Sequence, residues 1–183
     1  GCAECDPDPN SELIMTVRRC KKDPGAKLDY DLTLGAGFEN DTIASVTWIV
    51  PDGVVDEGQE TPSTHTARIW ISGGTLGVEY PITGRITTTG GRILDRTISL
   101  QIAENVKIVT KDPDSTEDYT IKWGRWLASK SDLIDVATWT AGTGITVADS
   151  SYTNKTSTVW LSGGSADSVV DARGRIETVG GRI

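Results

Sequence analysis

The sequence is poor in histidine and in the flexible or large apolar side chains that often fill helical cores. Its 183 residues include one histidine, one methionine and one phenylalanine. A histidine-based catalytic triad would have to use His65, and a site built from several histidines is excluded. His65 lies in a strand-like segment, so we expect it to have a structural role. The sequence also lacks a phosphate-binding loop, a dinucleotide fingerprint and a nucleophile elbow, and it predicts no enzyme, cofactor or resident metal.

Two further absences restrict the partners. The basic residues are scattered along a chain with a formal net charge of −8, so we do not expect binding to nucleic acid. No stretch approaches the roughly 20 apolar residues that cross a bilayer, and the first residues lack a signal-peptide pattern. These features predict a soluble chain that does not enter a membrane.

The residues that are plentiful favour an all-β fold. The chain contains 20 glycines and is rich in threonine and valine, which suit tight turns and strands. Short segments rich in β-branched and aromatic residues alternate with glycine- and proline-containing turns, and no helical periodicity of useful length is present. In the first half of the chain we expect strands at residues 28–34, 42–50, 64–72, 79–88 and 93–102.

One sequence unit occurs twice. The segment Lys22-Asp23-Pro24 recurs as Lys111-Asp112-Pro113, a shift of 89 residues, and later motifs recur in the same order with shifts of 89 to 91. They are Asp29-Tyr30 with Asp118-Tyr119, Val46-Thr47-Trp48 with Ala137-Thr138-Trp139, Ile69-Trp70-Ile71-Ser72-Gly73-Gly74 with Val159-Trp160-Leu161-Ser162-Gly163-Gly164, Gly84-Arg85-Ile86 with Gly174-Arg175-Ile176, and Gly90-Gly91-Arg92-Ile93 with Gly180-Gly181-Arg182-Ile183. The period exceeds that of solenoid repeats and suits a small β-sandwich.

The tryptophans fall into two groups. Trp48, Trp70 and their repeated counterparts Trp139 and Trp160 lie within strand patterns, and we expect them to anchor the cores. Trp123 and Trp126 have no evident counterpart in the first unit and lie in an expected loop. They are candidates for a contact surface, with local packing as the alternative.

All three cysteines precede the repeats. Cys2, Cys5 and Cys20 are one ligand short of a closed metal site, and their odd number leaves a sulfur for another chain. We expect them outside the cores, as candidates for an intersubunit disulfide or a surface thiol. A metal site completed by a partner and unreactive thiols are the alternatives.

The order Lys-Asp-Pro, Asp-Tyr, Thr-Trp, Trp-Ile/Leu-Ser-Gly-Gly, Gly-Arg-Ile and Gly-Gly-Arg resembles the Ig-like modules of tailed-bacteriophage virion proteins, including fibre-tail adaptor proteins. The resemblance covers residues 22–183. It implies an all-β chain of two tandem Ig-like β-sandwich domains, with a short N-terminal extension and no catalytic residues.

The expected domains are a cysteine-bearing docking segment at residues 1–21, a first sandwich at 22–105 and a second at 106–183. The second sandwich has no counterpart of residues 94–102, so its closing strand is either missing from the sequence or supplied from elsewhere. An open sheet edge invites strand addition. The apolar segment 13–19, with Leu13, Ile14 and Val17, is a candidate donor and interaction segment.

The resemblance also implies a function. We expect a non-enzymatic virion protein that acts as an adaptor at the head-tail junction or on the tail, where fibres attach. Its expected partners are connector, tail, fibre or capsid proteins, and it is expected to be a homo-oligomer in the particle. The alternatives are a capsid decoration protein and a receptor- or carbohydrate-binding module.

Overall fold

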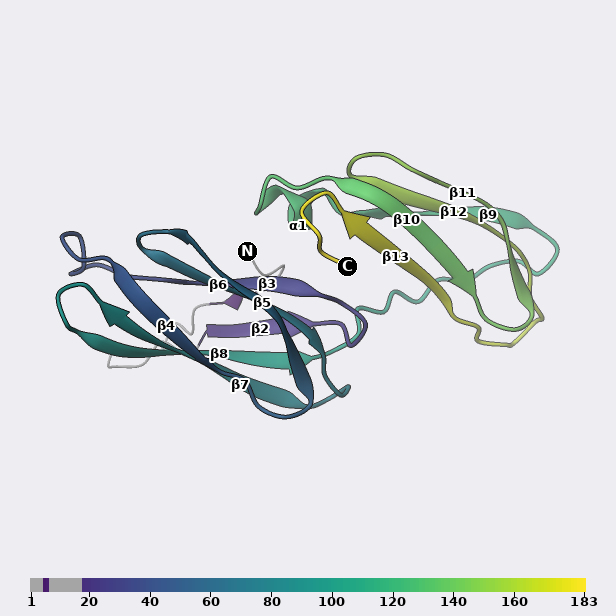
Figure 1. Ribbon diagram of the computed structural model, residues 1–183. Coiled ribbons are helices and arrows are strands. Elements are labelled where there is room, and N and C mark those ends of the chain that lie inside the picture. Colours follow the sequence, from purple (N-terminus) through teal and green to yellow (C-terminus); the bar gives the residue numbers. More distant parts are fainter. Residues whose placement is uncertain (1–4, 7–17) are drawn as a thin grey trace. The chain divides into compact units, whose positions relative to one another are not determined.

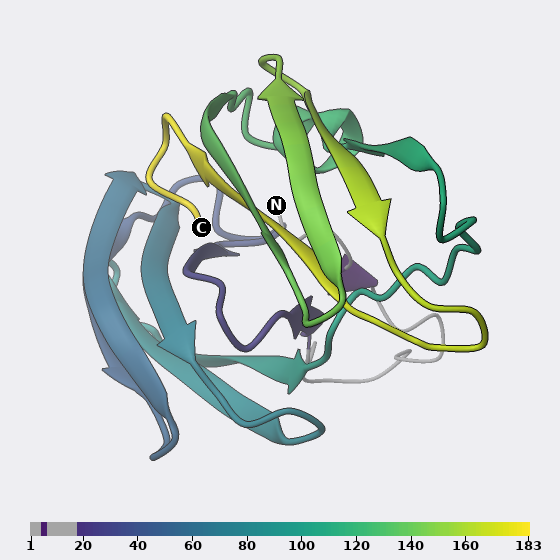
Figure 2. The ribbon, with the colours of Figure 1, turned by 90° about the vertical axis from the view of Figure 1, so that its right-hand side faces the viewer.

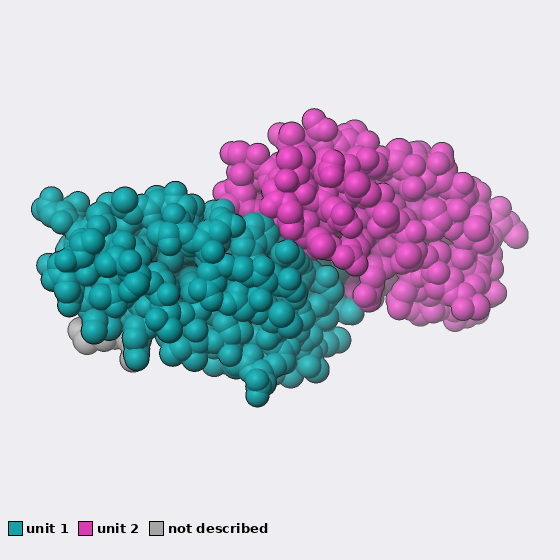
Figure 3. Space-filling model, in the orientation of Figure 1, with its two compact units in different colours: residues 1–105 teal, residues 106–183 magenta. Residues whose placement is uncertain are grey.

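The computed structural model describes residues 5, 6 and 18–183, and nearly all its regular structure is β-strand (Figure 1). The chain forms two compact units, Gly1–Asn105 and Val106–Ile183, which are coloured separately in Figure 3. Within each unit, extended strands lie in layered sheets, as Figure 2 shows from a second direction. The all-β fold class expected from composition is confirmed.

The first unit contains a five-stranded sheet in the order β1-β2-β8-β7-β4. Its neighbouring strands are antiparallel except for β2 and β8, which run parallel. The strands are β1 (Cys5–Asp6), β2 (Arg18–Lys22), β4 (Ile43–Ile49), β7 (Glu79–Thr88) and β8 (Ile93–Ile102). Because β8 lies between β2 and β7, it is an interior strand of this sheet.

A second, antiparallel sheet in the order β3-β6-β5 completes the first unit. Its strands are β3 (Leu28–Thr33), β6 (Thr66–Gly73) and β5 (Val54–Ser63). Side chains from both sheets form one buried cluster, which includes Tyr30, Ile69, Ile71, Ile82, Ile98 and Leu100. Fully burying an aliphatic side chain contributes about 1.5–3 kcal/mol, so this shared cluster holds the two sheets together as a sandwich.

The second unit repeats most of this plan with fewer strands. One sheet has the order β11-β12-β9 and the other pairs β10 with β13, all antiparallel. The elements are β9 (Thr116–Lys122), α1 (Gly124–Ala128), β10 (Ile134–Ala141), β11 (Ile145–Tyr152), β12 (Thr156–Gly163) and β13 (Ala172–Thr178). Buried side chains include Leu127, Ile134, Val159, Leu161 and Ile176.

The tryptophans expected in the cores take two different orientations. Trp48 packs against the first core, across Gly84 on the neighbouring strand. A Cβ atom added to Gly84 would lie 2.6 Å from Leu32 Cδ1, so only glycine leaves room for this packing. Trp139 lies across Gly174 in the same way. These two positions agree with the expected core role.

Trp70 and Trp160 do not anchor the cores. Trp70 is flanked along β6 by Ile69 and Ile71, which are both fully buried, and successive strand residues point to opposite faces. Trp70 is therefore on the outer face of its sheet. Trp160 holds the corresponding position between two buried residues of β12. The expectation failed because a partly exposed tryptophan satisfies the same alternating pattern as a buried one.

Three strands of the first unit, β1, β2 and β5, were not expected from the sequence. β5 has an acidic, glycine- and proline-containing sequence that reads as a loop, and its only partner among the described strands is β6. β2 begins at Arg18, so residues 18–21 belong to the first unit's sheet and not to a separate docking segment. Cys20 is also a buried member of the core, against the expectation that the cysteines lie outside it.

A lysine closes the same end of each sandwich. Lys22 is 2% exposed, and its Nζ donates to the carbonyl oxygens of Asp23 at 2.9 Å and Gly73 at 2.7 Å. Lys111 Nζ donates to Asp112 O at 2.6 Å and Gly163 O at 3.0 Å. Burial lowers the pKa of Lys22 from 10.5 to about 8, so the side chain stays protonated and able to donate at neutral pH. The repeated Lys-Asp-Pro motif therefore has a structural role.

Replacing this lysine tests that role. In the variant Lys22→Met the side chain still fills the space, but the carbonyl groups of Asp23 and Gly73 lose their donor. Leaving a buried acceptor unpaired costs about 1–3 kcal/mol, and we expect the free energy of unfolding of the first unit to fall by that amount. Urea denaturation, monitored by hydrogen exchange of the β6 amides, measures this change in the free energy of unfolding. Arg19→Met, an exposed position on the same strand, is the control, and equal stability of the two variants would contradict the prediction.

Candidate interaction sites

Trp123 is part of the second unit's packing. It precedes helix α1, packs against the cluster of Leu127, Ile134 and Ile176, and donates from Nε1 to Ser157 Oγ at 3.0 Å. Its backbone N–H donates to Lys155 O at 2.9 Å. In the first unit the N–H of Leu34, 89 residues earlier, donates to His65 O at 2.8 Å. Trp123 therefore replaces the buried Leu34, a counterpart that the difference in side chain conceals.

Trp126 also has a counterpart. It packs against the same cluster as Trp123, with ring centroids 6.3 Å apart in an edge-to-face arrangement. The Arg182 guanidinium lies 5.3 Å from the Trp126 ring centroid, and in the first unit Arg92 lies 5.0 Å from that of Phe38. Trp126 thus holds the place of Phe38 in a repeated cation-π contact. Both candidate tryptophans are partly buried, and their contacts are those of local packing.

A carboxylate fixes the loop after β3 to the hairpin between β7 and β8. Asp41 Oδ1 accepts hydrogen bonds from Thr42 N at 2.9 Å, Thr89 Oγ1 at 2.9 Å and Gly90 N at 2.8 Å. Hydrogen bonding, first from the Thr88 hydroxyl and then from Gly90, lowers the pKa of Asp41 from 3.8 to about 2. The carboxylate thus joins two loops that are 48 or 49 residues apart in sequence.

The second unit contains the same arrangement. Asp132 Oδ1 accepts from Leu133 N and Gly180 N, each at 2.9 Å, and Asp132 Oδ2 lies 3.8 Å from Arg182 Nη1. Burial alone would raise the pKa of Asp132, but hydrogen bonds from Thr178 and Gly180 outweigh it and the pKa is lowered. The repeated Gly-Gly-Arg motif is therefore a carboxylate-binding hairpin that also places an arginine over an aromatic ring.

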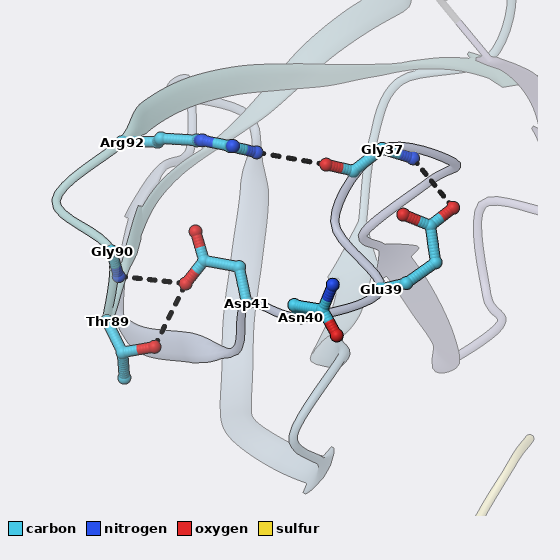
Figure 4. Close-up of a pocket in the computed structure, with 7 residues that line it drawn as sticks. All are labelled: Gly37, Glu39, Asn40, Asp41, Thr89, Gly90 and Arg92. Atoms are coloured by element: carbon cyan, nitrogen blue, oxygen red, sulfur yellow. Dashed lines mark hydrogen bonds between the residues drawn. The ribbon is translucent and has the colours of Figure 1, made fainter.

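Figure 4 shows an open depression beside this hairpin in the first unit. Several of the polar groups around it have partners within the protein. Arg92 Nη1 donates to Gly37 O at 3.0 Å, and Glu39 Oε1 accepts from Gly37 N at 2.9 Å. The depression is lined by Gly37, Glu39, Asn40, Asp41, Thr89, Gly90 and Arg92. Because these contacts fix the backbone of the surrounding loops, the polar side chains that line the depression have a structural role.

Cys20 forms a disulfide within the chain, so this thiol is not free to join another subunit, contrary to one expectation. The backbone of Cys5 pairs with that of Cys20 across β1 and β2. Cys2, Leu13, Ile14 and Val17 lie outside the described residues. In the described part of the chain, no group of three potential ligand side chains is placed to hold a metal, and no helix is long and apolar enough to cross a membrane.

The outer face of the β3-β6-β5 sheet carries an ion-pair network that the sequence analysis did not find. Arg68 donates to both carboxylate oxygens of Asp31, at 2.7 and 3.1 Å, and its Nε lies 3.2 Å from Asp29 Oδ2. Beside it, Trp70 Nε1 donates to Glu60 Oε1 at 2.9 Å, and Lys27 Nζ lies 5.8 Å from the Trp70 ring centroid. The alternating positions of Asp29 and Asp31 in the sequence indicated that both lie on one face of a strand. Their partner Arg68 lies on a strand distant in sequence, and the sequence alone could not identify it.

The described strand pairings of β7 and of its counterpart β13 differ. In the first unit β7 lies between β4 and β8. β13 carries the repeated Gly-Arg-Ile motif of β7, yet in the described part of the chain it pairs with β10 alone.

The Asp41 hairpin predicts a pH dependence. Because the pKa of the folded carboxyl is below its ordinary 3.8, its stabilising effect is present above pH 4 and is lost as the pH falls towards 2. Thermal unfolding should show the variant Asp41→Ala to be less stable at neutral pH, with a difference that shrinks below pH 4. Asp52→Ala, in an exposed turn, is the control. A stability difference independent of pH between 2 and 6 would contradict this role for the carboxylate.

Comparison with solved structures found many similar chains, and two of them are described below. One is a variant of an endo-fucoidan hydrolase from glycoside hydrolase family 107, with 17% identity, a TM-score of 0.36, and coverage of 87% of this chain and 27% of the other. The second is the same kind of hydrolase without the variant's substitution, with 13% identity, a TM-score of 0.33, and coverage of 85% and 26%. The protein thus spans about a quarter of the length of these enzymes, and likeness at this level identifies no function.

No curated protein matches the sequence. A family model does match, and it does so twice, at residues 22–101 and 111–183. The two matched segments correspond to the two copies of the repeated unit and together cover most of the chain. The chain therefore belongs to the family described as podophage GP4 fiber-tail adaptor protein gp77.

Proposed function

We propose that this protein is a non-enzymatic structural component of a phage virion, and that it acts as an adaptor at the head-tail junction or tail, where fibres are attached. The observation that carries this proposal is the match of both units to a fibre-tail adaptor family. Its partners would be other virion proteins, and it would be present as several copies in the particle. We also propose that each unit is an Ig-like sandwich.

The contacts inside each unit support a structural role. The lysine that bonds backbone carbonyls, the carboxylate-binding hairpin and the glycine beneath a tryptophan occur in both units. Each of them fixes backbone or packs the core, and together they account for most of the repeated motifs. Two units stabilised by the same contacts suit a rigid component that connects two other proteins.

The charged groups of the first unit support the same interpretation. Arg68 is bound by Asp29 and Asp31 on the neighbouring strand. Arg85 makes two hydrogen bonds of 2.8 Å with Asp95 across β7 and β8. Bidentate pairs of this kind orient neighbouring strands as well as attracting opposite charges. These side chains stabilise the sheets, and the surfaces left for partners are the strand edges and outer faces.

Removing the protein from the particle tests the proposal. We expect phage in which this gene is silenced to form heads filled with DNA but tails without fibres, because the adaptor would be missing. Negative-stain electron microscopy and an adsorption assay measure both effects, and expression of the intact gene from a plasmid should restore the fibres. A capsid decoration protein would instead leave fibres attached and weaken the head. Fibre-bearing tails in the silenced phage would therefore rule the adaptor role out.

A further inference from the structure

Four large apolar side chains are exposed at one end of the first unit. This end contains the turn between β4 and β5 and the loop between β6 and β7 (Figure 1). The turn and the loop adjoin each other at Tyr80. A Cβ atom added to Gly53 would lie 2.8 Å from Tyr80 Cε1, and Thr75 N donates to the Tyr80 hydroxyl at 3.2 Å. The four side chains, each 40% to 54% exposed, are Ile49, Val55, Leu76 and Val78.

The second unit has the same backbone at this end but different side chains. Val78 N donates to the carbonyl oxygen three residues earlier at 3.0 Å, and Ser168 N does the same at 3.3 Å. Val55 of β5 and Thr146 of β11 pair with equivalent serines on the next strand. At the positions of the four apolar residues the second unit has, in the same order, the exposed residues Thr140, Thr146, Ala166 and Ser168.

This difference separates a role in contact from a role in packing. The unit forms the same turn and the same strand register with threonine, alanine and serine at these positions, so the fold does not require apolar residues there. The exposed Val169 of the second unit stands at the position of Glu79, outside the four. Single exposed apolar residues are ordinary on a protein surface, whereas a group of them marks an interaction site.

The same end of the first unit is acidic. Residues 49–57 and 74–79 contain four carboxylates and no lysine or arginine. Lys22 and Lys27 lie nearby, but Lys22 is buried against carbonyl groups and Lys27 lies over the Trp70 ring. The four carboxylates, all on exposed residues, are Asp52, Asp56, Glu57 and Glu79. Residues 49–57 and 74–79, which we call the acidic apolar end, therefore combine apolar surface with negative charge.

The charge selects among possible occupants. A second copy that met this end about a two-fold axis would bring the same carboxylates together, and like charges facing each other oppose association. Nucleic acid and anionic membrane surfaces have the same sign of charge as this end. A protein surface with apolar side chains and with lysine or arginine beside them matches both of its properties.

We propose that the acidic apolar end of the first unit docks onto another polypeptide of the tail, whose surface carries apolar residues bordered by lysine or arginine. The source of this partner rests on the proposed adaptor function, whereas the surface itself rests on the comparison of the two units. Burial of the apolar side chains supplies affinity. The carboxylates orient the partner and increase the rate of association.

A variant that carries the second unit's residues tests the surface without disturbing the fold. Ile49→Thr, Val55→Thr, Leu76→Ala and Val78→Ser are combined in the full chain, which is expressed from a plasmid during infection by phage with the gene silenced. We expect circular dichroism to show a folded protein, because the second unit folds with these residues. The amount of the protein in purified particles should fall at least tenfold. Incorporation equal to that of the unchanged protein, or loss of the fold, would overturn the proposal.

The reverse exchange in the second unit is the matched control. Thr140→Ile, Thr146→Val, Ala166→Leu and Ser168→Val give that unit the side chains of the first and should leave incorporation unchanged. An equal loss of incorporation in both combined variants would contradict a specific role for the first unit's end.

Charge reversal tests the chemistry of the partner. The double variant Asp52→Lys with Asp56→Lys keeps the apolar side chains and should lower incorporation at least fivefold, because it places positive charge against the partner's lysines or arginines. Asp52→Asn with Asp56→Asn should have a smaller effect. Unchanged incorporation of the lysine variant would overturn the assigned charge of the partner.

Cross-linking in assembled particles identifies the partner. A photoreactive benzophenone amino acid replaces Leu76, and in a control chain it replaces Ala166, the equivalent residue of the second unit. Mass spectrometry should find Leu76 cross-linked to another tail polypeptide, in a segment that contains lysine or arginine, and the control should not reach that segment. Cross-links from position 76 to this protein alone would overturn the proposal. Cross-links to a capsid protein would overturn the tail adaptor role while leaving the docking surface in place.

Discussion

The position of β8 between β2 and β7 is the constraint on which the first unit depends. This strand supplies Ile98, Leu100 and Ile102 to the core, and each is 1% exposed or less. It also orders β2 and places Cys20 in the core, since β2 pairs with β8 along its whole length. The closed sandwich therefore follows from one strand having two partners. In the described part of the second unit, β13, the counterpart of β7, pairs with β10 alone.

The duplication separates the contacts that build the unit from those that distinguish its two copies. The lysine that bonds carbonyls, the aspartate that binds the hairpin and the arginine over an aromatic ring recur with different neighbours. Phe38 is replaced by Trp126 and Leu34 by Trp123, and in place of a loop the second unit has short helix α1, which follows Trp123 and contains Trp126. The larger side chains compensate for a different loop, so they report on packing rather than on a partner.

The sequence predicted the strands with branched apolar residues. Alternation of apolar and polar residues over six or more positions indicates, in a sandwich, a strand with one face buried and one exposed. It did not predict β5, whose acidic sequence, with one glycine and one proline, suits an exposed edge as well as a loop. It also placed Trp70 in the core, because alternation identifies two faces without saying which is buried when both carry an apolar residue. The carboxylate-binding hairpin was invisible, since Asp41 meets Gly90 only through the fold.

A cryo-electron microscopy reconstruction of isolated tails, at a resolution that shows side chains, tests the central claim most directly. The account predicts that this protein lies between the tail and its fibres. A reconstruction that shows the protein in contact with capsid alone would contradict it.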